Sequence, residues 1–327
     1  MVPEVKKSLR SISIIIPSWD GKDLLEKYLP SVIRAANFYK GETEIIVVDD
    51  GSTDGSIQFL KANYPLIKLI FLKDNQGFAK ACNVGVREST GDIVIFLNND
   101  MEVKEDFLIY LEKHFKYGKV FGVRPAIRAK QNELYNNPDI LRMGLEFKFG
   151  FIETHIMKID ANLTELYPHT FSVSGGAAAV DRRKFLKMNG FDELFSPFYW
   201  EDVDLSYRAW KRGWTIIYEP KSTVYHQQHS TISKKYKQSY IKMISERNRY
   251  LLVWKNITNW LVLTKHILCI PARILQTLIT GKSCHILSLI YALKFFNLLL
   301  LKRKEEKKWA KYSDIQLFNM FTYHVKE

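Results

Sequence analysis

The stretch Val47-Val48-Asp49-Asp50-Gly51-Ser52-Thr53-Asp54 decides the fold of this chain. An apolar run stops there on acidic and hydroxyl groups, and Phe96-Leu97-Asn98-Asn99-Asp100 repeats the arrangement further along. Buried strands of a parallel sheet read as short apolar runs, and open α/β sheets bind ligands beyond the carboxyl ends of their strands. The two polar tips therefore predict one cleft. Carboxylates in such a cleft suit a nucleotide sugar with a divalent metal, because hard cations prefer oxygen ligands and often bridge phosphates.

Strands and helices alternate around these two tips. The apolar spacing predicts strands at Ser13–Pro17, Glu44–Val48, Ile67–Leu72 and Asp92–Leu97, and helices at Lys22–Asn37, Ser56–Asn63, Gly77–Glu88 and Glu105–His114. This order is typical of βαβ units, so we expect an α/β fold with a mostly parallel sheet. From about 120 to 172 the pattern is irregular, with mixed short strands and the loop Gln131–Pro138. A helix then runs from the Trp200 region to a cap at Gly213, followed by short strands Thr215–Tyr218 and Ser222–Tyr225.

The charge of the chain is unevenly distributed. Residues 231–327 contain 18 Lys and Arg against 5 Asp and Glu, whereas the first 230 residues contain 30 of each sign. A basic, apolar tail behind a neutral globular part indicates an anionic partner for the tail, either nucleic acid or a membrane surface. We therefore divide the chain into a catalytic domain, 1–232, and a helical membrane-associating region, 233–327.

The tail contains two long apolar stretches, and both carry basic residues. Asn259–Thr280 includes Lys265, His266 and Arg273, and Ser283–Leu301 includes His285 and Lys294. Charges inside a spanning helix are costly. We therefore expect helices that lie in the interface of an anionic membrane, with spanning helices or a helical subdomain packed on the core as the alternatives.

The cysteines and the N-terminus indicate the cellular compartment of the protein. Cys82, Cys269 and Cys284 are far apart and form no CxxC pair, so we expect neither a disulfide framework nor a zinc site. The first apolar run is short and ends at Pro17, which makes a poor signal peptide and a good strand. These features predict a cytoplasmic protein, peripheral on the inner face of the cell membrane.

Four segments and a tail resemble family 2 glycosyltransferases of the GT-A fold, in the family's order. They are SIIIPSWDGKDLLEKYLPSV, EIIVVDDGSTDGS, NQGFAKACNVGVRESTGDIVIFLNND, SGGAAAVDRRKFLKMNGFDELFSPFYWEDVDLSYRAWKRGW and TVYHQQHS. The later part resembles the rhamnosyltransferase-like branch, and the match runs from residue 11 to about residue 232. The resemblance implies inverting, metal-dependent sugar transfer from a nucleoside-diphosphate donor (dTDP-rhamnose or a UDP-sugar). The acceptor would be a hydroxyl of a glycan or of a polyprenyl-linked carrier in cell-surface polysaccharide synthesis.

The resemblance also assigns residues to the nucleotide. It implies that Asp50 accepts the imide N–H of uracil or thymine, that Pro17 and Ser18 line the base and ribose pocket, and that Ser52 belongs to the same motif. The alternative is a turn and helix cap, because Asp and Ser satisfy free backbone N–H groups.

Three more residues are placed near the nucleotide by the same analogy: Asn75, Gly77 and Asn83. The helix that opens here has free N–H groups that suit phosphate or ribose. Gly77 is equally a candidate turn glycine.

The metal ligands implied by the family are less complete here. Asn98-Asn99-Asp100 occupies the place of the DxD motif, so Asp100 is the predicted ligand and Asn98 offers only a neutral oxygen near the donor. Related enzymes use a histidine after the later strand, which makes His226 the second predicted ligand, ahead of His229. The expected cofactor is Mn²⁺ or Mg²⁺, since imidazole is an acceptable ligand for manganese.

The sequence Trp200-Glu201-Asp202-Val203-Asp204 holds the predicted catalytic centre. An inverting transferase needs one general base to deprotonate the acceptor hydroxyl. The resemblance makes Asp202 that base, with Glu201 as the second choice, and adjacent acids raise each other's pKa. Trp200 is a candidate to stack on a sugar of the acceptor or to pack in the core. The alternative for the acids is ordinary complementarity to the helix dipole.

Three neighbouring features have simpler explanations. Gly175 and Gly176 allow close approach of the backbone, either to the acceptor or donor sugar or to a tight helix–sheet contact. Asp204 and Arg208 lie one helical turn apart, which predicts a structural ion pair.

Other functions explain fewer of these residues. A nucleotidyltransferase would show a Gly-rich basic loop where Pro17-Ser18-Trp19-Asp20 stands, and a dinucleotide oxidoreductase would need G-x-G-x-x-G there. A processive polysaccharide synthase would have a QxxRW motif. A nucleic-acid-binding protein accounts for the basic tail but not for Trp200–Asp204, so nucleic acid is not an expected partner.

Overall fold

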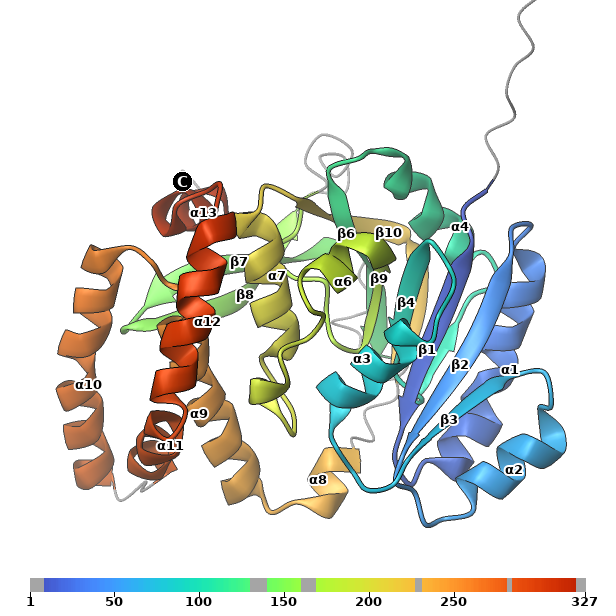
Figure 1. Ribbon diagram of the computed structural model, residues 1–327, viewed down its shortest axis with the longest axis horizontal. Helices are drawn as coiled ribbons and strands as arrows, with labels where there is room; N and C mark the ends of the chain where they lie inside the picture. The colour runs from blue at the N-terminus through green and yellow to red at the C-terminus, as the bar shows by residue number, and fades with distance from the viewer. Residues whose placement is uncertain (1–8, 130–139, 160–168, 227–230, 281–283, 322–327) are drawn as a thin grey trace, which may run out of the picture.

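A computed structural model describes residues 9–129, 140–159, 169–226, 231–280 and 284–321. Its centre is an eight-stranded sheet with the order β3-β2-β1-β4-β9-β6-β10-β5 (Figure 1). Strands β1 to β4 pair in parallel, whereas β9 and the edge strand β5 are antiparallel to their neighbours. The strands are β1 Ile12–Ser18, β2 Thr43–Asp50, β3 Lys68–Leu72, β4 Ile93–Leu97, β5 Met101–Val103, β6 Val120–Ala129, β9 Ala177–Asp181 and β10 Thr215–His226.

Helices cover both faces of this sheet, and each face has its own apolar core. One face carries α1 (Lys22–Phe38), α2 (Ser56–Asn63) and α4 (Phe107–Glu112), which pack on the outer side chains of β1, β2 and β4. The other face carries α3 (Phe78–Arg87), α6 (Arg182–Lys187) and α7 (Glu201–Lys211). Both faces of the central strands are buried, which explains why they read as continuous apolar runs rather than as alternating patterns.

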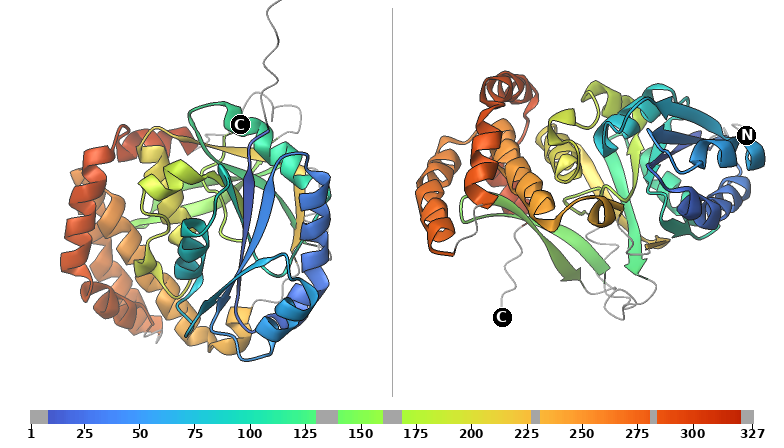
Figure 2. Two further views of the ribbon diagram at one scale, coloured as in Figure 1. Left: turned by 45° about the vertical axis from the view of Figure 1, so that its right-hand side comes forward. Right: turned by 90° about the horizontal axis from the view of Figure 1, so that it is seen from below.

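The C-terminal helices form the end of the molecule opposite the first strands, apart from α8, which lies nearer those strands (Figures 1 and 2). They are α8 Thr231–Lys235, α9 Gln238–Asn256, α10 Trp260–Thr280, α11 Cys284–Leu293, α12 Phe296–Trp309 and α13 Asp314–Phe321. Leu251, Leu299 and Leu317 of these helices are buried in the same core as Leu205 of α7. The predicted catalytic domain and C-terminal region therefore share one apolar core.

Hydropathy gives no complete membrane span among the described residues. No single helix there has both the length and the apolar character to cross a bilayer. Only the pair His285–Leu293 and Phe296–Trp309, bent by 71°, meets the two criteria together.

From about 120 to 172 we expected mixed short strands and a loop at Gln131–Pro138. The structure has strands there that are longer than expected, and Gln131–Pro138 lies outside the described residues. That segment contains β6, which pairs with β9 and β10, and the separate hairpin of β7 (Ile140–Lys148) and β8 (Phe151–Ile159). The partners of β6 are distant in sequence, so local pattern gave no sign of the pairing. The two short strands predicted after Gly213 are one strand, β10, with a register irregularity between Glu219 and Thr223.

The topology brings the predicted motifs to one edge of the sheet. The parallel strands β1, β2, β4 and β10 end there, at Ser18, Asp50, Leu97 and His226. Strand β9 runs the opposite way and begins at the same edge, directly after Gly176. One edge therefore collects every polar strand end that the sequence singled out.

The shared core predicts that the catalytic domain does not fold without the helices that follow it. A chain of residues 1–232 would uncover the apolar face of α7 and remove Lys255 and Asp314, the buried partners of Asp204 and Lys211. We expect it to lack the cooperative thermal transition of the full chain, measured by circular dichroism. Cooperative unfolding of the shortened chain with unchanged donor affinity would contradict this.

Candidate active site

A cavity of about 340 Å³ lies at this edge of the sheet. Its size is at the lower end of the range for small-molecule sites. It is lined by most of the residues predicted to hold the donor and the metal: Pro17, Ser18, Asp50, Asn75, Gly77, Asn98, Asp100 and His226. The structure thus assembles side chains from four strand ends and from the turn before α3 around one space.

Asp50 is held by the turn that precedes α3. Its carboxylate accepts the backbone N–H of Gln76 at 2.7 Å and of Gly77 at 2.8 Å. Burial and the neighbouring Asp49 raise the pKa of Asp50, and the two N–H groups oppose the shift. A carboxylate has more lone pairs than these bonds use. Asp50 therefore fixes the turn and still has acceptor capacity for a donor base.

Gly77 is required by the backbone. Its φ is +88°, and a Cβ at this position would lie 2.9 Å from the carbonyl oxygen of Pro197. Pro197 belongs to the loop before α7 and lines the cavity. The glycine therefore allows the turn before α3 and the loop before α7 to meet, which explains it as a turn residue whether or not it also contacts phosphate.

Two predicted donor residues do not line the cavity. The Ser52 hydroxyl accepts the N–H of Asp20 at 2.8 Å, and its own N–H donates to Asp49. The Asn83 side chain is buried and bonds the backbone N–H and C=O of Phe191, both at 2.9 Å. Each side chain braces a loop, so we do not carry either into the proposed donor site.

Asp100 and His226 come together across the edge of the sheet. His226 Nε2 lies 3.1 Å from Asp100 Oδ2. Asp100 Oδ1 is buried, and no described residue bonds it. No group of three or more His, Cys, Asp and Glu side chains in the described ranges is arranged to hold a metal. The pair nevertheless fits a divalent cation that takes its remaining ligands from substrate phosphates and water, as Mg²⁺ commonly does. His229 lies outside the described residues.

Asp202 lies in the first turn of α7 and does not itself line the cavity. Its Oδ2 accepts the N–H of Gly175 at 2.9 Å, and its Oδ1 accepts the N–H of Val203 at 2.8 Å. The adjacent Gly176 accepts the N–H of Asn98 at 2.9 Å, and Asn98 lines the cavity. A chain of backbone contacts therefore links the predicted base to the predicted donor site.

The two glycines at this link differ. A Cβ on Gly176 would lie 2.8 Å from Met101 Cε, so tight packing accounts for this residue. A Cβ on Gly175 would meet nothing closer than 3.6 Å, at Glu201 Oε1. Gly175 donates its N–H to Asp202, and a Cβ at this position would be in ordinary van der Waals contact with Glu201 and Asp202.

The backbone before Asp202 adopts an unusual conformation. Tyr199 and Trp200 have φ values of +73° and +76°, a region that non-glycine residues rarely occupy. The Trp200 indole N–H donates to Ser245 of α9 at 3.0 Å, which anchors the ring. Trp200 is thus held as part of the packed structure. Strain of this kind persists where surrounding contacts enforce it, often at functional sites.

Glu201 and Asp202 sit in different environments. Glu201 is buried, and burial together with the charge of Asp202 raises its pKa to about 8. Burial also raises the pKa of Asp202, but the N–H groups of Gly175 and Val203 oppose that shift. Neighbouring acids with separated pKa values divide into a neutral group and a charged group near pH 7. Asp202 is the member suited to accept a proton.

Three aromatic side chains form one wall of the cavity, and the sequence pattern did not predict this wall. Trp19, Phe198 and Tyr236 line the cavity, with ring centroids of Tyr236 6.2 Å from Trp19 and 5.4 Å from Phe198. Lys235 forms an ion pair with Asp20 at 2.5 Å, which joins the segment of Tyr236 to the segment of Trp19. Tyr236 follows α8, in the region assigned to the tail. No local pattern signalled that the chain returns to the donor side here.

Comparison with known proteins identifies the family of the chain. Residues 13–188, more than half of the chain, match the model of glycosyl transferase family 2. The chain belongs to glycosyl transferase family 2. It is 28% identical over 228 residues to N-acetylglucosaminyl-diphospho-decaprenol L-rhamnosyltransferase of Mycobacterium tuberculosis (strain ATCC 25618 / H37Rv), with 63% of this chain and 73% of that protein covered. The family prediction and the resemblance to rhamnosyltransferases are confirmed, and the protein is a glycosyltransferase.

Solved structures confirm the GT-A fold. GalNAc-T7 with UDP, GalNAc and Mn²⁺ superposes with a TM-score of 0.59 at 17% identity, covering 76% of this chain and 48% of that one. The mannosyltransferase PcManGT from Pyrobaculum calidifontis, in complex with GDP-Man and Mn²⁺, gives 0.54 at 16% identity, covering 94% and 89%. At these identities the likeness concerns the fold alone.

The raised pKa of Glu201 predicts a pH-dependent cost to folding. Between its usual pKa and about 8, the folded glycosyltransferase keeps a proton that the unfolded chain releases, so stability falls as pH rises. Glu201→Gln removes this dependence. We expect the free energy of unfolding of the variant, relative to that of wild type, to be larger at about pH 8 than at about pH 5 when both are measured with urea. An equal difference at both pH values would contradict the assignment.

Proposed function

We propose that this glycosyltransferase moves a sugar with inversion from a nucleoside-diphosphate donor to an acceptor hydroxyl, with Asp202 as general base. The observation that carries the proposal is the adjacency of the cavity and Asp202, joined by the contacts of Gly175 and Gly176. The donor occupies the cavity and the acceptor approaches over Gly175. One carboxylate suffices for the chemistry, because an inverting enzyme needs no second covalent step.

Donor recognition divides among the strand ends. The base lies near Pro17, Ser18 and Asp50, with the aromatic ring of Tyr236 available for stacking. Asn75 and Gly77 lie at the ribose and phosphates, and Asn98 lies toward the sugar. dTDP-rhamnose is the first candidate donor and a UDP-sugar the second.

Asp100 and His226 would hold Mn²⁺ or Mg²⁺ at the diphosphate. When bound, the metal supplies Lewis-acid stabilisation of the charge on the departing nucleoside diphosphate. The unbonded, buried Oδ1 of Asp100 supports this role among the described residues.

Asp202 acts on the acceptor. The acceptor oxygen forms a bond to the anomeric carbon as the bond from that carbon to the diphosphate breaks, and the hydroxyl proton passes to Asp202. The N–H groups of Gly175 and Val203 keep the carboxylate oriented for this transfer. Glu201 stays protonated beside it and limits the negative charge in the site.

The acceptor we propose is a polyprenyl-linked or other glycan in cell-surface polysaccharide synthesis. The mycobacterial relative is by name a rhamnosyltransferase that acts on a diphospho-decaprenol carrier. Such an acceptor lies at a membrane, so the enzyme would work on the inner face of the cell membrane from the cytoplasm.

A surface suited to an anionic membrane lies on the C-terminal helices. Large apolar side chains are exposed there in sequence-adjacent elements: Leu275 and Ile279 of α10, Leu287, Ile290 and Leu293 of α11, and Phe296, Leu298, Leu300 and Leu301 of α12. Exposed lysines adjoin them at Lys294, Lys304, Lys307 and Lys308. Apolar side chains flanked by basic residues favour insertion at the interface of an anionic bilayer.

The enzyme proposal is tested with a donor panel. Purified full-length enzyme is assayed for hydrolysis and transfer with UDP-, GDP- and dTDP-sugars, with and without Mn²⁺. We expect turnover with one donor class and a gain on adding metal. Asp202→Asn should lower kcat by about 10²–10⁴-fold with donor KM little changed, because only proton transfer is removed. Absence of turnover and of binding with every donor would refute the enzyme proposal, whereas full activity of the variant would refute the base.

The membrane proposal is tested by co-sedimentation with vesicles. Wild type should sediment with phosphatidylcholine vesicles that contain phosphatidylglycerol, and less with phosphatidylcholine alone. Ile290→Glu with Leu301→Glu should abolish binding. Leu66→Glu is the matched control, because Leu66 is 99% exposed outside the C-terminal helices. Wild type left in the supernatant with anionic vesicles, or unimpaired binding by the double variant, would contradict the proposal.

A further inference from the structure

Helix α9 contacts the catalytic segment at two separate points. Its C-terminal residues Lys255 and Asn256 reach Asp204 in the first turn of α7, and Asn248, two turns earlier, reaches the loop that leads into α7. Both contacts flank Asp202, although α9 contributes no residue to the chemistry proposed above. This arrangement suggests a task for α9 in the reaction.

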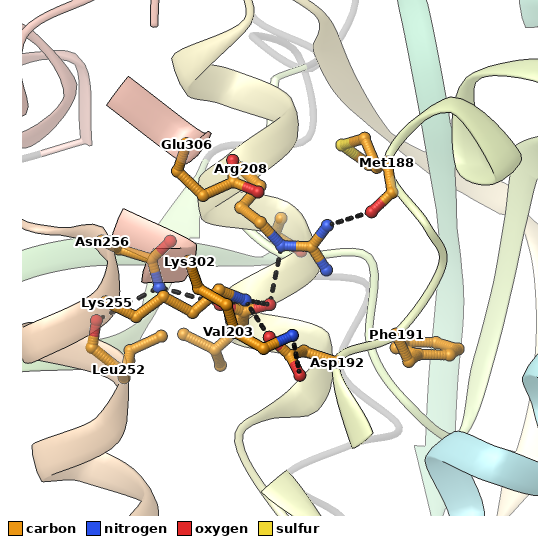
Figure 3. A network of polar contacts seen from close by, with 12 residues as sticks. Met188, Phe191, Asp192, Val203, Arg208, Leu252, Lys255, Asn256, Lys302 and Glu306 are labelled. Atoms are coloured by element: carbon orange, nitrogen blue, oxygen red, sulfur yellow. Dashed lines mark hydrogen bonds and ion pairs between the residues drawn. The ribbon is translucent and has the colours of Figure 1, made fainter. Parts of the chain in front are cut away.

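The first point is a buried ionic cluster (Figure 3). Lys255 Nζ lies 2.8 Å from Asp204 Oδ1, 2.9 Å from Asp204 Oδ2 and 2.7 Å from Asp192 Oδ2. Arg208 adds a 2.7 Å ion pair to Asp204, as the sequence predicted, and Asn256 adds an amide bond at 2.8 Å. Lys255 and Asp204 are at most 2% exposed. The Lys255 ammonium, on α9, therefore binds both α7 and the loop that contains Asp192.

The second point is the strained loop before α7. The Asn248 side-chain amide donates to the carbonyl oxygens of Phe195, Phe198 and Tyr199, at 2.7, 3.0 and 2.9 Å. Asn248 is fully buried, and Tyr199 begins the pair of residues with positive φ. Phe198 and Tyr199 also line the donor cavity. Asn248 therefore touches the donor wall as well as the entry to α7, whereas Lys255 contacts α7 and the Asp192 loop and does not line the cavity.

We propose that α9 positions the catalytic base, Asp202, with Lys255 and Asn248 as the positioning residues. The inference rests on the proposed role of Asp202. A helix whose buried carboxylate is held by a lysine from another element cannot rotate or slide without separating that pair, and Asp202 lies half a turn from Asp204 on the same helix. Small displacements of a reacting group are costly in rate, about 10²-fold for 1 Å. Lys255 thus fixes the base relative to the acceptor, and Asn248 fixes it relative to the donor.

The test compares kcat with donor KM in full-length variants. Lys255→Met should lower kcat by about 10–10²-fold with donor KM within about twofold, because the donor cavity lies apart from Lys255. Lys255→Arg should recover most of kcat, since it restores the cation. Asn248→Ala should lower kcat and also raise donor KM. Lys302→Met is the matched control with near-wild-type kcat, because Lys302 pairs with Asp192 at 3.1 Å and not with Asp204.

The outcomes separate this inference from the proposed function. A wild type inactive with every donor would sink the function itself. An active wild type with a folded Lys255→Met variant of equal kcat would overturn the positioning role, as would an equal loss in Lys302→Met. If Lys255→Met does not fold, Lys255→Gln decides, because its neutral amide fills part of the space but loses the ion pairs with Asp204 and Asp192. Wild-type kcat in that folded variant overturns the inference, and a fall with unchanged KM supports it.

Discussion

The buried carboxylate of Asp204 is the constraint on which the arrangement of the C-terminal half depends. A fully buried carboxylate is tolerated only with several charged or hydrogen-bonding partners. Arg208 from its own helix supplies one, and Lys255 and Asn256 of α9 supply the others. Because these partners are on different elements, α7 and α9 can pack in only one register that satisfies the charge. The same pattern recurs at Asp314, which binds Lys211 and Tyr207 of α7 and ties α13 to the helix.

The donor side is organised by a different constraint, the common edge of parallel strands. Asp50 ends β2 at this edge and Asp100 lies in the turn between β4 and β5, and their surroundings differ. Asp50 is fixed by two backbone N–H groups and stabilises the turn that holds Gly77. Asp100 faces His226 and keeps one buried oxygen unbonded among the described residues. Two similar-looking strand tips in the sequence therefore have different surroundings in the structure.

Local pattern predicted what depends on neighbours in sequence. The first four strands and their helices, the strand-tip motifs and the α7 ion pair of Asp204 and Arg208 follow from spacing and residue type, and the structure has them. Features that depend on distant partners were not predictable in this way. Strand β6 pairs only with strands far away in sequence. Ser52 and Asn83 have the polarity of ligand-binding residues, but Asp20 and Phe191, distant in sequence, occupy their side chains.

Three carboxylates within the first turn of α7 show how position alone divides one residue type into three roles. Glu201 is buried without a bonded cation, so its pKa rises and it remains neutral. Asp202 is half-buried against two N–H groups, which favour the anion that proton transfer requires. Burial acts to raise the pKa of Asp204 as well, but Arg208 and Lys255 outweigh it and hold that pKa below its usual range. The charge of Asp204 is therefore neutralised locally and adds little repulsion at Asp202. Of the two acids beside Asp202, Glu201 therefore keeps its proton up to about pH 8 and Asp204 is ion-paired.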